Sequence, residues 1–77
     1  MKCFTYLGSE FELILGSDVE RDGMFLELEG PGHVQLAEVF YSDSSKKMSL
    51  TYAKEGIDVE LLEILIRHAR TALPEQH

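Results

Sequence analysis

The fold is decided first by residues 3–15, which read CFTYLGSEFELIL. Apolar and polar side chains alternate on both sides of a central Gly-Ser pair, a pattern typical of two half-buried antiparallel strands. Glycine at the first central position favours a two-residue type II′ turn at Gly8-Ser9. Such a turn pairs Phe4 with Leu13 across the hairpin. One face of the hairpin then collects Phe4, Tyr6, Phe11, Leu13 and Leu15.

Turn-rich segments divide the rest of the first 53 residues into further runs of strand length. We expect strands at about 2–7, 10–15, 24–29, 33–41 and 48–53. The clean alternation in 24–29 predicts that Leu15 pairs with Met24. A slip of one residue in this register is excluded because it would exchange the apolar and polar faces of the strand. A slip of two residues remains open. Pairing across the loop at 42–47 sets Tyr41 opposite Met48.

The fourth expected strand, 33–41, does not alternate cleanly. A regular strand leaves Val34, Leu36 and Phe40 on the face that a single helix cannot cover. A β-bulge near Ala37-Glu38 would instead turn Val34 and Leu36 inward. The sequence leaves both arrangements open.

The C-terminal part predicts one amphipathic helix, at about 58–72. Asp58 follows the helix-breaking Gly56 and is the expected N-cap residue. The apolar stripe consists of Val59, Leu62, Ile66, Ala69 and Leu73, and it is widened by Leu61, Ile64 and Leu65. Residues 74–77 form an expected tail. The sequence therefore predicts a single α+β domain spanning 1–77, an antiparallel five-stranded β-meander with the helix packed on one sheet face.

The composition restricts the class of partner and the compartment. The chain of 77 residues carries a formal net charge of −7, which argues against nucleic-acid binding and against anionic membrane surfaces. No apolar run approaches the roughly 20 residues that a transmembrane helix needs. Cys3 is the only cysteine, so no disulfide forms within the chain. The lone thiol and the absence of a signal peptide predict a soluble cytoplasmic protein.

Glutamates gather on the sheet face that the helix leaves open. In the predicted register Glu12 lies opposite Glu27, and Glu10 lies opposite Glu29. Like charges directly opposite one another destabilise a sheet. One interpretation is a docking surface for a cation or a basic protein, and the other is that the side chains splay into water. A hydrolase with paired carboxylates is disfavoured because it needs a concave, partly apolar pocket that raises one carboxyl pKa.

We expect no metal site, no cofactor and no catalytic residue. The three histidines, His33, His68 and His77, have no metal-ligand spacing among themselves or with Cys3. Cys3 has no neighbouring cation on its own strand face and no helix N-terminus to activate it. The glycines match no phosphate-binding pattern.

Apolar residues on the open face complete the candidate interaction residues. These are Phe25, Ile14, Leu36 and Phe40, together with Glu10, Glu12, Glu27 and Glu29. A contiguous apolar patch on a small protein usually marks an interface. The function hypothesis is a non-enzymatic protein-interaction domain that forms a homodimer or binds a protein partner, with an inhibitor or immunity-type protein for a basic target as its specific form. The alternative is an enzyme or ligand-binding protein with a site at an oligomer interface, where Glu38 and His33 are the acid and the base.

Overall fold

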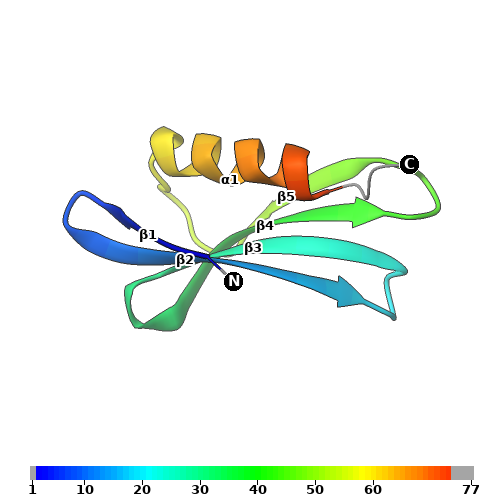
Figure 1. Ribbon diagram of the computed structural model, residues 1–77, viewed down its shortest axis with the longest axis horizontal. Coiled ribbons are helices and arrows are strands. Elements are labelled where there is room, and N and C mark those ends of the chain that lie inside the picture. Colours follow the sequence, from blue (N-terminus) through cyan, green and yellow to red (C-terminus); the bar gives the residue numbers. More distant parts are fainter. Residues whose placement is uncertain (1, 74–77) are drawn as a thin grey trace.

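The computed structural model describes residues 2–73, which form five strands followed by one α-helix. The elements are β1 (Lys2–Tyr6), β2 (Ser9–Asp18), β3 (Gly23–Gly30), the 3-10 turn η1 (Pro31–His33), β4 (Val34–Ser42), β5 (Met48–Tyr52) and α1 (Val59–Ala72). The strands form one antiparallel sheet in the order β1-β2-β3-β4-β5, and α1 covers one face of it (Figure 1). The predicted α+β meander is confirmed. The predicted tail at 74–77 lies outside the described residues. Within residues 2–73, no helix has the length and apolarity to cross a membrane.

The β1–β2 hairpin turns one residue earlier than predicted. Leu7 and Gly8 are its two central residues, with φ of 49° and 80°, which is the left-handed conformation that a type I′ turn requires at both positions. Phe4 therefore pairs with Phe11, so the predicted register is wrong by two residues while the assignment of faces stays correct. The ring centroids of Phe4 and Phe11 lie 5.7 Å apart, and the Tyr6 ring meets Phe11 edge-on at 6.0 Å. Such aromatic pairs stabilise the hairpin beyond the area that they bury.

The β2–β3 hairpin is longer than predicted. β2 continues to Asp18, and Leu15 pairs with Leu26, so this register is also wrong by two residues with the same parity. The turn is closed by Asp18, whose Oδ1 accepts hydrogen bonds from the backbone N–H groups of Glu20 at 3.1 Å and Arg21 at 3.2 Å. Aspartate commonly replaces backbone partners in this way, and here it lets both strands extend towards the turn.

A β-bulge interrupts β4 at Leu36, one residue before the position considered in the sequence. Leu28 pairs with Ala37, but Glu29 pairs with Gln35, which leaves Leu36 without a partner on β3. The side chain of Leu36 packs against the core on the helix side. The bulge therefore removes Leu36 from the open face, where the regular strand would have placed it.

The remaining part of β4 follows the sequence prediction. Tyr41 pairs with Met48 and Val39 pairs with Leu50, as expected from the alternation of the two strands. Val34 pairs with Gly30 beyond the bulge and remains 48% exposed. The bulge thus turns Val34 out of the open face without burying it.

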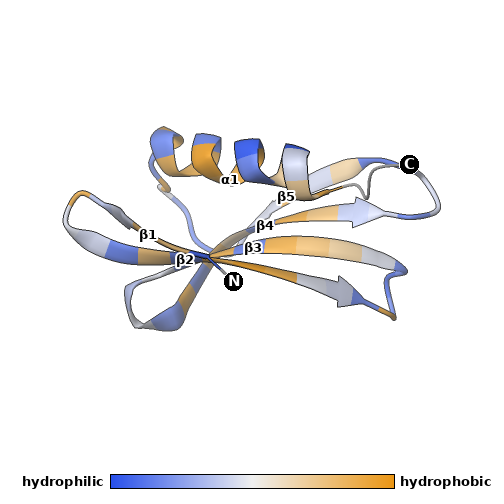
Figure 2. Cartoon of the chain, viewed as in Figure 1, coloured by the Kyte–Doolittle hydropathy of each residue, from blue (hydrophilic) through white to orange (hydrophobic). Residues whose placement is uncertain are grey.

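The core lies between α1 and the sheet, where apolar side chains from both layers pack together. Hydrophobic residues occur along α1 and along the strands that it covers (Figure 2). Its buried members are Phe11, Leu13, Leu26, Leu28, Ala37, Val39, Tyr41, Leu61, Leu65, Ala69 and Leu73. The predicted centre of the helical stripe is wrong, because Leu65 is fully buried while Leu62 is half-buried and Val59 is 63% exposed. Residues four apart form a straight ridge on a helix, and the row from Leu61 to Leu73 is the one that meets the twisted sheet.

The first turn of α1 is tied to the N-terminal hairpin. Asp58 occupies the predicted N-cap position, but its side chain makes no capping hydrogen bond. Its carboxylate instead accepts a hydrogen bond of 3.0 Å from the hydroxyl group of Tyr6, and Glu60 accepts a longer one of 3.5 Å. Loss of surrounding water and these two neighbouring carboxylates raise the pKa of Tyr6 to about 12. The contact fixes the distance between β1 and the start of the helix.

Candidate functional site

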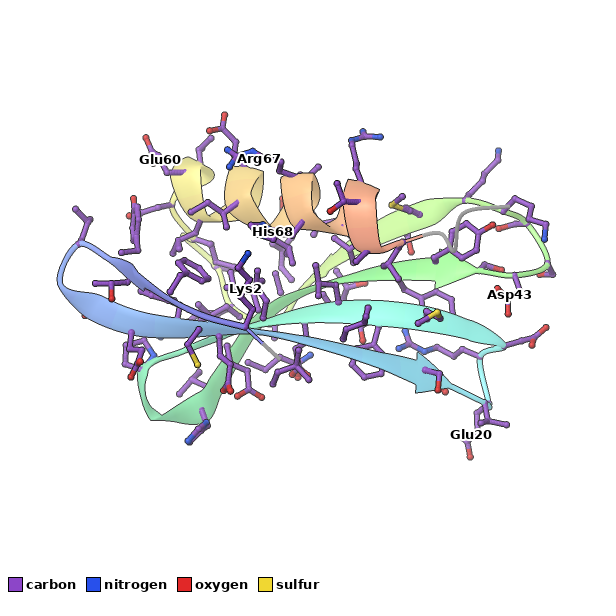
Figure 3. All side chains as sticks on the ribbon, viewed as in Figure 1. Lys2, Glu20, Asp43, Glu60, Arg67 and His68 are labelled. Carbon is purple, nitrogen blue, oxygen red and sulfur yellow. The ribbon has the colours of Figure 1, made fainter. Side chains whose placement is uncertain are left out.

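The sheet face opposite α1 carries the candidate site, and we call it the open face. Its central side chains come from β2, β3 and β4, and they alternate with the core residues of the same strands. They are Glu12, Ile14, Phe25, Glu27, Glu29, Glu38 and Phe40, all of them half-buried. Figure 3 shows Glu60 and Arg67 of α1 on the helix side of the molecule, away from this face. The open face and the outer helix face are therefore separate surfaces.

Two pairs of glutamates face each other across the open face. Glu12 lies opposite Glu29, and Glu27 lies opposite Glu38, in place of the pairs expected from the sequence. The side chains of Glu12, Glu29 and Glu38 are only 16%, 17% and 15% exposed. They therefore do not splay freely into water, which was the competing interpretation of this cluster. Glu10, opposite Thr5 near the end of the sheet, is exposed.

Glu27 lies in the middle of this charge distribution. Partial burial raises the pKa of its carboxyl group above the usual value, and the neighbouring charges of Glu29 and Glu38 raise it further. Among residues 2–73, no basic side chain forms an ion pair with Glu27. A cation bound at this position would offset the repulsion from Glu29 and Glu38 and part of the cost of burying the Glu27 carboxylate.

His33 connects the other glutamate pair. The turn η1 gives His33 a φ of 62°, and its Nδ1 lies 3.4 Å from Glu29 and 3.7 Å from Glu12. The three donor atoms lie within 4.8 Å of one another, and an imidazole with two carboxylates is a set that Zn²⁺ accepts. Nδ1 of His33 also lies within ion-pair distance of both carboxylates, so the cluster can form without a metal ion. The thiol of Cys3 lies 3.9 Å from Glu12 beside this cluster.

The His33 cluster is hard to predict from the sequence. Glu29 and His33 are four residues apart, but they belong to a strand and a turn, where that spacing has no fixed geometry. The cluster forms because η1 reverses the chain and brings the imidazole back over β3. The Pro-Gly pair before His33 was the available signal, since it predicts a tight reversal.

Arg21 is a residue of the candidate site that the sequence did not indicate. From the β2–β3 turn, its side chain lies over the open face, where Nη1 and Nη2 donate to the two carboxylate oxygens of Glu38 at 3.2 Å and 3.0 Å. Its Nε donates to Asp18, and its guanidinium carbon lies 4.1 Å from the centre of the Phe40 ring. Hydrogen bonds to Glu38 and Asp18 raise the pKa of Arg21, and the hydrogen bond from Arg21 lowers the pKa of Asp18.

The apolar residues of the open face are placed differently from the sequence prediction. Phe25 lies directly opposite Phe40 and Gly16, and Ile14 lies opposite Glu27. The Phe25 ring lies over Gly16, where an added Cβ atom would be only 2.6 Å from Cζ of the ring. The glycine in β2 is therefore required by the ring that covers it. With Leu36 on the helix side, the apolar part of the open face is smaller than expected.

The predicted alternative of an acid–base pair is not assembled within the described chain. Glu38 is bound by Arg21, whereas His33 contacts Glu12 and Glu29, and no ion pair joins His33 to Glu38 in residues 2–73. The open face is instead a sheet surface with four paired carboxylates and two aromatic rings at its centre. Comparison with known proteins finds no relative, since no family model, no curated protein and no solved structure matches this chain.

Proposed function

We propose that this protein is a non-enzymatic interaction domain whose open face binds a basic segment of a partner protein. The proposal rests on four glutamates of three adjacent strands that face one another in two pairs, Glu12 with Glu29 and Glu27 with Glu38. Opposed like charges weaken a sheet, and partial burial increases that cost. A basic segment docked across the pairs would compensate for both.

Charge also favours the encounter with such a partner. The net charge of −7 attracts a basic protein at long range, and complementary charge speeds association. In its specific form the proposal is an inhibitor that occupies the basic active or binding surface of its target. We propose that the two proteins meet in the cytoplasm, where an exposed thiol such as that of Cys3 stays reduced.

A homodimer through the open face is the second candidate, and the geometry supports it less well. A two-fold interface presents the same patch on both subunits, so glutamates would face glutamates. The apolar contribution from each subunit is limited to the half-buried Ile14, Phe25 and Phe40. A basic partner satisfies the carboxylates that a second copy would repel.

The test uses deca-lysine as a basic probe and isothermal titration calorimetry at low salt. The double variant Glu12→Gln/Glu29→Gln removes two charges from the open face. The matched control Glu55→Gln/Glu63→Gln removes two charges from exposed positions outside it. We expect the open-face variant to bind deca-lysine about tenfold more weakly than the control does, because its charges lie at the contact.

Amide NMR spectra recorded during the same titration locate the contact. Shifts concentrated in β2, β3 and β4 support the proposal. Equal weakening of both double variants, or shifts confined to α1, would mean that the probe responds to net charge alone, and the proposal would then be wrong. A wild type that dimerises at micromolar concentration in light scattering, and no longer does so as Phe25→Glu, would favour the homodimer instead.

A further inference from the structure

Arg21 binds the open face in the way that an arginine from another protein would. Its guanidinium group donates two hydrogen bonds to the two carboxylate oxygens of Glu38, and its central carbon lies over Phe40, 4.1 Å from the ring centre. Paired hydrogen bonds to a carboxylate and stacking on an aromatic ring are the two interactions that distinguish arginine from lysine. Phe40 and Glu38 are therefore an arginine-binding pair that the chain fills with its own side chain.

The neighbouring strand repeats this pair. On β3, Phe25 and Glu27 are two residues apart on the open face, as Glu38 and Phe40 are on β4, and the two strands set Phe25 opposite Phe40 and Glu27 opposite Glu38. Both rings also lie over glycines. A Cβ atom added to Gly16 would be 2.6 Å from the Phe25 ring, and one added to Gly23 would be 2.6 Å from the Phe40 ring.

The Phe40/Glu38 pair holds a cation, whereas the Phe25/Glu27 pair does not. Within residues 2–73, Arg21 over Phe40 is the single cation–π contact, and Glu27 has no ion-pair partner. Burial also raises the pKa of the Glu27 carboxyl group. The Phe25/Glu27 pair thus has the composition of an arginine site and carries an uncompensated negative charge.

We propose that Phe25 and Glu27 bind the guanidinium group of an arginine side chain supplied by the basic partner. This inference rests on the proposed function and specifies which cation the open face recognises. Ile14, opposite Glu27, lies where it can contact the methylene groups of the incoming side chain. The bound arginine would lie beside Arg21, with Glu27 and Glu38 between them balancing the two positive charges.

The test compares deca-arginine with deca-lysine, which carry equal charge, in calorimetric titrations of the intact chain. We expect the wild type to bind deca-arginine about tenfold more tightly than deca-lysine. Glu27→Gln preserves the shape of the side chain, and Phe25→Leu preserves an apolar residue without a ring. Each should reduce the preference for arginine to about twofold or less. The control Glu63→Gln, on the exposed face of α1, should leave the preference unchanged.

The outcomes separate this inference from the proposed function. Equal affinity of the wild type for both peptides would overturn the arginine site while the open face still binds a basic partner. A preference that survives both Glu27→Gln and Phe25→Leu would place arginine recognition elsewhere, and the inference would then be wrong. Failure of both peptides to bind would refute the inference and the proposed function together. If Phe25→Leu does not fold, as judged by circular dichroism, the isosteric Glu27→Gln variant decides the result.

Discussion

Replacing Leu65 by alanine tests how α1 packs on the sheet. Leu65 is 0% exposed, so the substitution removes three fully buried carbon atoms. At about 0.8 kcal/mol for each carbon, the transfer contribution alone is about 2.4 kcal/mol. The cavity that remains increases the loss to about 3–4 kcal/mol. A domain of this size has a free energy of unfolding on the order of 5 kcal/mol, so most of its stability would be lost.

Val59→Ala on the same helix is the matched control. Val59 is 63% exposed, so the two carbons that it loses contribute only about 0.6 kcal/mol of burial. The higher helix propensity of alanine offsets about 0.5 kcal/mol of this. Urea denaturation followed by circular dichroism should therefore give a large loss for Leu65→Ala and almost none for Val59→Ala. Equal losses, or a larger loss for Val59→Ala, would refute the orientation of α1 described above.

Three further predictions concern the charged groups. Because loss of water and the carboxylates of Asp58 and Glu60 raise the pKa of Tyr6 to about 12, Tyr6→Phe should remove a late ionisation phase near pH 12 from an ultraviolet titration. Asp58→Asn should lower the pKa of Tyr6, and an unchanged late phase in either variant would contradict the contact. Because the folded-state pKa of Glu27 is raised, the wild type loses stability as pH rises from the ordinary glutamate pKa through the folded value. The melting temperature of Glu27→Gln should exceed that of the wild type at pH 7 and approach it near pH 3; the same offset at both pH values would show that charge is not the cause. Arg21→Ala leaves Glu38 without its cation and should lower the melting temperature at low salt more than at 1 M salt, with Arg21→Lys intermediate. Arg21→Lys indistinguishable from the wild type would mean that the paired hydrogen bonds contribute nothing.

The sequence predicted the order of the five strands and the helix, because alternation with a period of two residues is a strong signal in a sheet with one buried face and the helix has its own apolar stripe. It did not predict η1, which takes His33 out of the fourth strand. It failed on the exact pairing of the first two hairpins. Burial decides which side chains face the core, but a shift of two residues leaves these faces unchanged. The turn decides between such registers, and in the first hairpin Leu7 adopts a left-handed conformation that leucine disfavours. The helix position was correct, but its wide apolar surface did not reveal which row of residues faces the sheet.

The candidate site was predicted only in outline. The acidic character of the open face follows from the strand pattern, so Glu12, Glu27 and Glu29 were identified. Arg21 was not, because its partner Glu38 is 17 residues away and the contact depends on the twist of the β2–β3 hairpin. His33 was paired with Glu38 in the alternative hypothesis, whereas it contacts Glu12 and Glu29, for a similar reason. Contacts made by turn residues depend on how each turn closes, and periodicity carries no information about that closure.

The two outer strands of the sheet have a consequence for how a partner can bind. Within the described chain β1 and β5 each pair with one strand only, so each leaves a row of backbone groups free to recruit another strand. All four lysines of the protein lie next to these strands, with Lys2 at the start of β1, Lys46 and Lys47 before β5, and Lys54 after it. Positive charges at a strand edge discourage the addition of further strands. They would also repel a basic segment that approached along an edge, so the proposed basic partner would approach the open face instead.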